Sequence, residues 1–271
     1  MAKVRINNLV YHYQRKGKGS PLVLLHGFTG SLRSWNELAG ELSSQVESVA
    51  IDLPGHGQTE SSIDPIRYNI EHTAADIISI ADVLGLGQFS LLGYSMGGRL
   101  ALYLAVHFPK RIKALIVESA SPGIAHEAER IQRRKWDYDL AGHIEKEGII
   151  PFVSWWEQLP LFASQSAVSE QRRANLRQER VKNNAQGLAN SLRGMGTGSQ
   201  SSLWGALPNI TIPTLLLCGS FDEKYVQITR DMARIMPNAE LVIFQDAGHN
   251  IHFEQLEAFK IILSNFLLRV E

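Results

Sequence analysis

Ser95 is the residue of this 271-residue chain whose setting most clearly suggests chemistry. It stands in the run Gly93-Tyr94-Ser95-Met96-Gly97, with one glycine two residues before it and another two residues after it. The apolar run 89–92 predicts a short buried strand before the serine, and residues 98–107 predict a helix after it. A sharp turn between a strand and a helix exposes a serine hydroxyl beside backbone N–H groups that can hold developing negative charge. The pattern therefore predicts a nucleophilic or basic serine.

Two residues with complementary chemistry follow predicted strands later in the chain. Asp222 comes after the apolar run 214–218, and His249 comes after the run 240–244. A histidine can take the serine proton, and an aspartate can fix the imidazole tautomer and stabilise the imidazolium. We therefore predict a catalytic triad of Ser95, His249 and Asp222.

The acidic member of this triad has a competitor. Asp222 could instead cap the helix that follows it, and Glu118, which also follows a predicted strand, is the rival acid. We favour Asp222 because Gly-x-x-Asp opens a loop at the point where the order serine, acid, histidine requires the acid. A second histidine nearby, His252, is expected on a helix surface.

A fourth element lies near the N-terminus. The apolar run 22–25 is followed by His26-Gly27-Phe28, a strand and a loop of the kind that donates a backbone N–H to an oxyanion. The turn at Ser95 supplies a second donor. We expect the backbone N–H groups of Phe28 and Met96 to form the oxyanion hole.

The predicted elements alternate between strand and helix along most of the chain, which is typical of an α/β fold with a mostly parallel sheet and helices on both faces. Apolar residues recur with a period near 3.6 over residues 69–84, as in an amphipathic helix. Residues 3–15 predict a hairpin that turns near Asn7 and Asn8. The remaining predicted strands are 22–26, 46–52, 89–92, 112–117, 214–218 and 240–244, and the remaining predicted helices are 35–42, 98–107, 225–236 and 251–269.

The alternation stops at Ser121-Pro122-Gly123 and resumes only near residue 214. We interpret residues 123–202 as a helical cap over the carboxyl ends of the strands, and residues 1–122 with 203–271 as the α/β core. The alternative is an insertion that stabilises the fold without contributing to binding.

Arginines suggest what the site binds. Arg99 is four residues after Ser95, in the first turn of a predicted helix, where a cation is disfavoured unless an anion compensates it. An ion pair with a nearby acid is the alternative. The predicted cap holds 8 of the 17 arginines of the chain: Arg130, Arg133, Arg134, Arg172, Arg173, Arg177, Arg180 and Arg193. Most are expected on solvated faces, but one or two pointing down beside Arg99 would form a forked-donor site for a polycarboxylate.

Composition narrows the function classes. The formal net charge is +0, so no basic surface for nucleic acid or an anionic membrane is indicated. No apolar run approaches the length of a membrane span, and residues 1–8 have no signal-peptide core, so we expect no membrane insertion and a cytoplasmic location. Cys218, the only cysteine, is expected to be a small core residue. No metal-ligand spacing, phosphate loop or dinucleotide fingerprint is present, so no cofactor is expected, and a monomer is plausible.

The chain resembles one family closely, the 2-succinyl-6-hydroxy-2,4-cyclohexadiene-1-carboxylate synthases of menaquinone biosynthesis, which have the α/β-hydrolase fold. The resemblance extends over almost the whole chain. Its most specific parts are Tyr-Ser-Met-Gly-Gly-Arg and two segments of the predicted cap. The matching segments are LHGFTGS at 25–31, DLPGHG at 52–57, GYSMGGRLAL at 93–102, ERIQRRKWD at 129–137, WWEQLPLFAS at 155–164, RVKNNAQGL at 180–188, CGSFDEKY at 218–225 and AGHNIHFE at 247–254.

The resemblance implies roles for particular residues. Ser95, Asp222 and His249 match the triad of the family. Matches to its substrate-binding residues are Tyr94, Arg99, Arg133, Trp156 and Arg180, with the neighbours Arg134 and Trp155 leaving two of these positions open by one residue.

The resemblance also implies a reaction, the elimination of pyruvate from 2-succinyl-5-enolpyruvyl-6-hydroxy-3-cyclohexene-1-carboxylate. The triad would act as the base on a proton α to the succinyl carbonyl, and the oxyanion hole would hold the enolate-like oxygen. The substrate is then a small polycarboxylate. Two alternatives stay open: a carboxylester or carbon–carbon bond hydrolase with the same triad, and a non-catalytic small-molecule receptor.

Overall fold

An eight-stranded sheet forms the centre of the computed structural model, which describes residues 2–270. The strands are β1 (Ala2–Ile6), β2 (Leu9–Gly17), β3 (Ser20–Leu25), β4 (Val46–Ile51), β5 (Phe89–Tyr94), β6 (Ile112–Glu118), β7 (Thr214–Gly219) and β8 (Ala239–Phe244). Their spatial order is β1-β2-β4-β3-β5-β6-β7-β8. β1 and β2 pair antiparallel with each other and β2 with β4, whereas all pairs from β4 to β8 are parallel. The predicted α/β fold with a mostly parallel sheet is confirmed.

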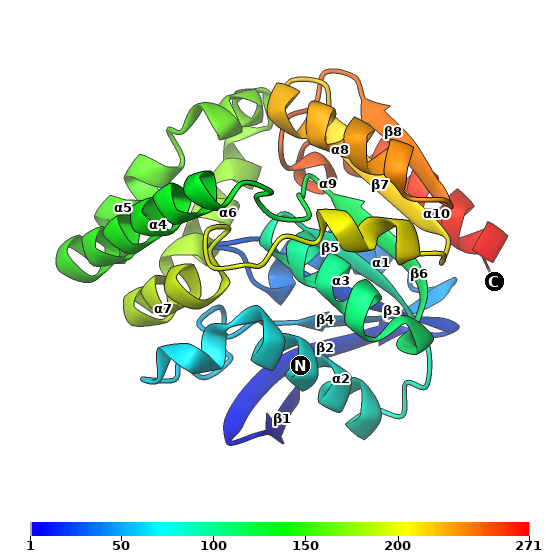
Figure 1. Ribbon diagram of the computed structural model, residues 1–271, viewed down its shortest axis with the longest axis horizontal. Coiled ribbons are helices and arrows are strands. Elements are labelled where there is room, and N and C mark those ends of the chain that lie inside the picture. The colour runs from blue at the N-terminus through cyan, green and yellow to red at the C-terminus, as the bar shows by residue number, and fades with distance from the viewer. Residues whose placement is uncertain (1, 271) are drawn as a thin grey trace.

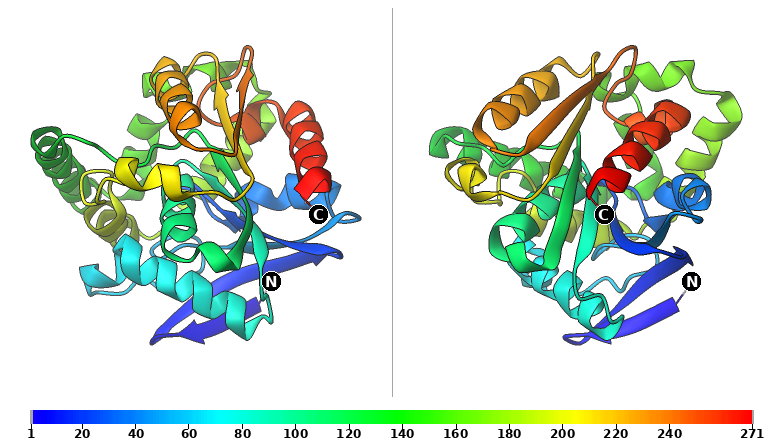
Figure 2. Two further views of the ribbon diagram at one scale, coloured as in Figure 1. Left: turned by 45° about the vertical axis from the view of Figure 1, so that its right-hand side comes forward. Right: turned by 90° about the vertical axis from the view of Figure 1, so that its right-hand side faces the viewer.

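The two antiparallel strands form the predicted hairpin. Asn7 and Asn8 both have positive φ, 46° and 66°, which is the backbone that a two-residue hairpin turn requires and that asparagine tolerates. The views in Figure 2 show this hairpin at the edge of the sheet opposite β8.

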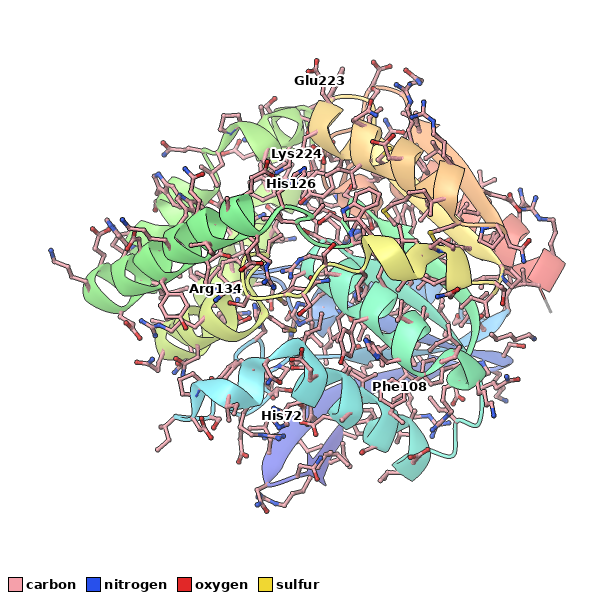
Figure 3. All side chains as sticks on the ribbon, viewed as in Figure 1. His72, Phe108, His126, Arg134, Glu223 and Lys224 are labelled. Carbon is pink, nitrogen blue, oxygen red and sulfur yellow. The ribbon has the colours of Figure 1, made fainter. Side chains whose placement is uncertain are left out.

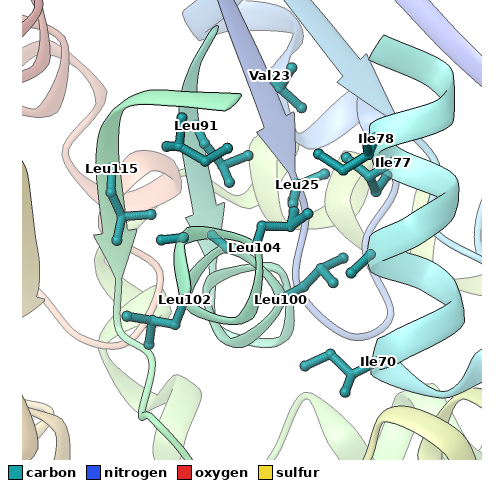
Figure 4. Close-up of a cluster of buried hydrophobic side chains, with 14 of the residues drawn as sticks. Val23, Leu25, Ile70, Ile77, Ile78, Leu91, Leu100, Leu102, Leu104 and Leu115 are labelled. Carbon is teal, nitrogen blue, oxygen red and sulfur yellow. The ribbon is translucent and has the colours of Figure 1, made fainter. Parts of the chain in front are cut away.

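Side chains of the central strands point alternately to the two faces of the sheet, where they pack in two apolar layers. In β3, Val23 and Leu25 face one layer, while Leu22 and Leu24 face the other. The first layer packs against α2 (Ile70–Val83), α3 (Met96–His107) and α8 (Glu223–Ile235), and the second packs against α1 (Asn36–Glu41) and α10 (Leu256–Val270). Figure 4 shows the part of the first layer that lies against α2 and α3. Strands buried on both faces explain why these segments read as continuous apolar runs.

The helices of the sheet region follow the predicted positions closely. They are α1 (Asn36–Glu41), α2 (Ile70–Val83), α3 (Met96–His107), α8 (Glu223–Ile235), α9 (Ile251–Glu254) and α10 (Leu256–Val270), with 3-10 helices η1 (Leu32–Trp35), η2 (Pro65–Tyr68), η3 (Pro109–Arg111) and η5 (Trp204–Asn209). The predicted single helix 251–269 is wrong in one respect. It is interrupted at Gln255, whose φ of −133° and ψ of 57° are not helical.

The segment between β6 and β7 contains four α-helices and no strand within the described residues. These helices are α4 (Glu127–Glu147), α5 (Ile149–Trp156), α6 (Glu170–Val181) and α7 (Ala185–Met195), with the 3-10 helix η4 (Pro160–Ala167). They lie together beside the sheet (Figure 1). They have an apolar cluster of their own, which includes Ile144, Phe152 and Leu188. Among residues 2–270, no helix is both long and apolar enough to cross a membrane.

Candidate active site

The turn at Ser95 has the strained geometry that its glycine spacing predicts. Ser95 adopts φ 51° and ψ −105°, a conformation that residues with a side chain rarely take. The Ser95 N–H donates to the backbone carbonyl of Glu118 at 2.8 Å, and the Gly97 N–H donates to that of His26 at 3.1 Å. Neighbouring strand ends therefore hold the turn on both sides.

The glycines that flank Ser95 leave room for this turn. A Cβ atom at Gly93 would lie 2.2 Å from the carbonyl oxygen of Gly97, and a Cβ atom at Gly97 would lie 2.2 Å from that of Leu25. Both distances are far below van der Waals contact. Side chains at these positions would force the turn away from the strand ends, so the serine depends on both glycines.

Ser95, His249 and Asp222 form a continuous chain of hydrogen-bonding atoms. His249 Nε2 lies 3.0 Å from Ser95 Oγ, and His249 Nδ1 lies 2.6 Å from Asp222 Oδ2. Asp222 is the residue before α8, yet its side chain makes no capping hydrogen bond, so the carboxylate serves the histidine and not the helix. This geometry is that of a base, its orienting acid and a hydroxyl.

The loops that carry Asp222 and His249 are bonded to each other. The Phe221 N–H donates to the carbonyl of Ala247 at 2.9 Å, and the Asp246 N–H donates to Ser220 Oγ at 3.0 Å. These bonds explain how two residues on separate loops keep a separation of 2.6 Å between their side chains.

Glu118, the rival acid, has a different histidine as partner. Its carboxylate lies 2.7 Å from His252 Nδ1 and accepts the His252 N–H at 3.1 Å. The prediction that His252 lies on a helix surface is wrong, because this side chain is buried between Glu118 and Trp35, whose ring stacks on it at 4.2 Å. Helix periodicity missed it because α9 has only one turn and is covered on both sides.

The loop after β3 lies against the turn at Ser95, because the Gly97 N–H donates to the carbonyl of His26. Met96 is the first residue of α3, where backbone N–H groups have no acceptor within the helix. Phe28 follows Gly27, whose carbonyl accepts the Gly30 N–H at 3.0 Å. His26 Nε2 accepts the Leu53 N–H at 3.0 Å, and burial lowers the pKa of His26. The imidazole is therefore neutral and holds this loop in place by hydrogen bonding.

Ser95 opens into a cavity of about 220 Å³ between the strand ends and the helical insertion. Sequence-predicted residues on its wall are Phe28, Tyr94, Ser95, Met96, Arg99, Arg133, Trp156 and His249. Burial raises the pKa of Tyr94 well above its usual value, so its hydroxyl stays protonated. The cavity thus combines the base, the expected oxyanion donors and two guanidinium groups.

Arg99 is a buried cation without an ion-pair partner among the described residues. It is 8% exposed, and its Nη1 donates to the side-chain oxygen of Gln200 at 3.0 Å. Burial lowers its pKa to about 10, so it remains charged at neutral pH. An unpaired buried charge is unfavourable in the folded chain. The position is therefore suited to an incoming carboxylate.

The geometry distinguishes between the neighbouring residues of the insertion. Arg133 reaches the cavity and is oriented by Asp137 at 2.8 Å, whereas Arg134 on α4 (Figure 3) donates to the carbonyl of Gly198. Trp156 lines the cavity, whereas Trp155 is 45% exposed and faces another groove.

Arg180 is the predicted substrate-binding residue that does not line this cavity, although its charge acts on the Tyr94 hydroxyl and lowers the Tyr94 pKa against the effect of burial. It is buried against the Phe162 ring, 5.2 Å from the ring centroid, and its Nη1 donates to Glu157 Oε1 at 3.1 Å. It lines a second cavity of about 440 Å³, and Leu159 and Phe162 line both cavities.

The structure adds wall residues that the sequence reasoning missed. Tyr225 lies against His249, with ring centroids 4.8 Å apart, and Lys224 contributes a further cation at the start of α8 (Figure 3). The sequence signal that could have identified them was their position, since Lys224 is two residues and Tyr225 three residues after Asp222. Others are Trp136, Ser191 and Thr197. Within residues 2–270, no cluster of three or more histidine, cysteine, aspartate or glutamate residues could hold a metal ion.

Comparisons with known proteins agree with this geometry. The sequence profile of the alpha/beta hydrolase fold matches residues 20–256. The 2-succinyl-6-hydroxy-2,4-cyclohexadiene-1-carboxylate synthase of Serratia proteamaculans (strain 568) is 34% identical over 91% of this chain and 92% of its own length. A Bacillus subtilis (strain 168) protein that bears the same name provisionally is 43% identical over 92% of this chain and 90% of its own length.

Comparison with solved structures identifies the same fold. MenH from S. aureus is 37% identical, with a TM-score of 0.92 over 96% of this chain and 98% of that chain. A thermophilic esterase from Thermogutta terrifontis with malate bound has a TM-score of 0.89 at 24% identity over 100% of this chain and 99% of that chain, a likeness that concerns the fold alone.

Proposed function

Because the chain belongs to the 2-succinyl-6-hydroxy-2,4-cyclohexadiene-1-carboxylate synthase family, within the α/β-hydrolase fold, we propose that it is a lyase of menaquinone biosynthesis. It eliminates pyruvate from 2-succinyl-5-enolpyruvyl-6-hydroxy-3-cyclohexene-1-carboxylate. The product is 2-succinyl-6-hydroxy-2,4-cyclohexadiene-1-carboxylate.

The observation that carries this proposal is that one cavity holds both a Ser–His base and Arg99, a buried cation without an ion-pair partner among the described residues. Arg99 is buried there with an amide oxygen as its hydrogen-bond acceptor, and Arg133 reaches the same space from α4. A neutral ester would leave the charge of Arg99 unpaired, whereas a substrate with several carboxylates would compensate it.

The triad would begin the reaction by proton abstraction. Ser95, with His249 as its base and Asp222 holding the imidazole, removes the ring proton α to the succinyl carbonyl. The N–H groups of Phe28 and Met96 hold the enolate oxygen that forms. Electrons then move through the ring double bond and expel the enolpyruvyl oxygen, and the released enolpyruvate takes a proton to become pyruvate.

We assign the substrate carboxylates to Arg99 and Arg133, with Tyr94 and Trp156 shaping the wall around the ring. Arg180 would join them if the wall of Leu159 and Phe162 rearranged. We further propose that residues 123–202 act as a cap, since the insertion supplies part of the cavity lining. A cytoplasmic location fits the single, buried Cys218.

The deciding experiment compares two reactions of the purified protein. Pyruvate release from the cyclohexene substrate is measured beside hydrolysis of a neutral aryl ester. The proposal expects kcat/KM for pyruvate release to exceed that for the ester by several orders of magnitude. If the ester is the better substrate, the protein is a hydrolase that uses the same triad.

A further inference from the structure

Asn183 is a buried side chain far from Ser95 in sequence that connects three segments of the active-site region. It is 5% exposed and lies two residues after the end of α6, in the Arg-x-x-Asn-Asn motif. Its Nδ2 donates to the carbonyl of Thr29 at 2.8 Å and to that of Arg180 at 3.1 Å, while its Oδ1 accepts the Gly57 N–H at 2.8 Å. The side-chain amide therefore uses both of its N–H groups and its oxygen.

The loop that Asn183 holds is the one with the expected oxyanion donor. Thr29 follows Phe28 and has a φ of 66°, which is unfavourable for a β-branched residue. On the other side of Phe28, the Gly27 carbonyl lies 2.8 Å from His26 Nδ1 and accepts the Gly30 N–H. The peptide at Phe28 is thus fixed from one side by its own loop and from the other by Asn183.

The second loop held by Asn183 is equally constrained. Gly57 has a φ of 55°, and a Cβ atom there would lie 2.2 Å from Asp52 Oδ2. The same Asp52 carboxylate accepts the N–H groups of Leu32 at 2.6 Å and Gln58 at 2.9 Å. Asn183 therefore attaches the end of α6 to a rigid part of the core.

We propose that Asn183 is a positioning residue that offsets the backbone strain at Thr29 and thereby sets the Phe28 N–H for the transition state. The inference rests on the proposed function for its kinetic consequence. Asn183 does not line the cavity and contacts Arg180 only through its backbone carbonyl, so its loss should act on turnover and not on substrate affinity.

The test uses two neighbouring asparagines. Asn183→Asp keeps the size and the acceptor for Gly57 but removes both donors. Asn184→Asp is the matched control, because Asn184 is exposed and caps α7 through its oxygen, a role that aspartate fills equally well. We expect Asn183→Asp to lower kcat about tenfold to a hundredfold, a part of what loss of an oxyanion donor costs, with KM changed less than about threefold. Asn184→Asp should match the wild type.

Hydrogen exchange of the peptide that covers residues 27–32 gives a second readout, which does not depend on the reaction. The exchange of this peptide should become faster in Asn183→Asp and stay unchanged in Asn184→Asp. Unchanged exchange, a kcat within about twofold of wild type, or an effect on KM alone would each overturn the proposal. If the wild type released no pyruvate, the proposed function would fail, while the exchange measurement would still test the attachment of the loop.

A double variant separates a folding defect from an effect on turnover. If Asn183→Asp does not fold, Asn183→Asp/Thr29→Gly is compared with Thr29→Gly, because glycine adopts positive φ without strain. Because Thr29→Gly removes the strain that Asn183 offsets, the double variant should fold and its kcat should lie within about twofold of that of Thr29→Gly. A kcat more than about tenfold below that of Thr29→Gly would contradict the assignment, because Asn183 would then act by another route than the strain at Thr29.

Discussion

The strand-end loops and the helical insertion both contribute residues to the same cavity, but they hold these residues in place by different interactions. Ser95 is fixed by backbone hydrogen bonds between strand ends, within a turn that its glycines permit. The insertion instead orients its arginines through side chains, Arg133 by Asp137 and Arg180 by Glu157. A backbone-held group keeps its place when the ligand changes, whereas an ion pair can exchange one carboxylate for another.

This difference assigns separate kinetic roles to the two regions. Changes in the strand-end loops should lower kcat for any substrate, because they alter the reacting groups. Changes in the insertion should act mainly on substrates with carboxylates, because they alter the recognition of charge. The following experiments test that division.

Ser95→Ala should have the largest effect. We expect the protein to fold as before and turnover to fall by about 10⁶-fold, since removal of the serine of a triad leaves only binding and the oxyanion hole. Steady-state pyruvate release measures turnover, and circular dichroism with thermal unfolding checks the fold. Retention of more than about a tenth of wild-type turnover would exclude Ser95 as the central group.

Asp222→Asn should rank second. An amide in this place favours the wrong tautomer of His249, and comparable changes in triad enzymes cost about 10⁴-fold in turnover. Glu118→Gln is the matched comparison, because Glu118 binds His252 and not His249. It should lower turnover less than tenfold while costing about 1–3 kcal/mol of stability through its buried hydrogen bonds. The reverse ranking at fixed pH would make Glu118 the acid.

The sheet could be predicted from the sequence because its strands are buried on both faces, so apolar runs and breakers mark them directly. The triad candidates follow from the same pattern, since each stands at the carboxyl end of such a run. The environment of His252 could not be predicted, because its burial arises from Trp35 and Glu118, which are distant in sequence.

The insertion was harder to predict for a related reason. Its helices pack on one another through a small apolar cluster, and a helical pattern does not say which of two neighbouring residues faces inward. The choice between Arg133 and Arg134 depends on the rotation of α4, and that between Trp155 and Trp156 on the end of α5. Gln200 as the partner of Arg99 lies 101 residues away and had no sequence signal.

Arg133→Ala should show the role of the insertion. Loss of a charge-assisted contact leaves a substrate carboxylate poorly paired, at about 1.5–3 kcal/mol, which corresponds to a decrease in kcat/KM of about tenfold to a few hundredfold. Arg134→Ala is the control, because Arg134 donates to the Gly198 carbonyl outside the cavity. A neutral aryl ester should be insensitive to both changes. Equal losses for the charged and neutral substrates would remove the division between the two regions.

Arg99→Met should have the smallest effect on stability, and one of opposite sign: the protein should become more stable while it loses substrate binding. The guanidinium is buried and its pKa is lowered to about 10, so at neutral pH the folded protein holds an unfavourable charge that methionine would remove. The free energy of unfolding should rise by on the order of 1 kcal/mol in the absence of substrate.

This effect should depend on pH. Because the pKa of Arg99 is lower in the folded than in the unfolded protein, the cost of burying the charged guanidinium is present at neutral pH and decreases as the pH rises through about 10. Thermal unfolding of wild type, Arg99→Met and Arg99→Lys at pH 7, each with and without a small dicarboxylate, measures both parts. A lower melting temperature for Arg99→Met without ligand would mean that the hydrogen bond to Gln200 already compensates the charge, and that Arg99 is structural like the arginines on the outside of the insertion.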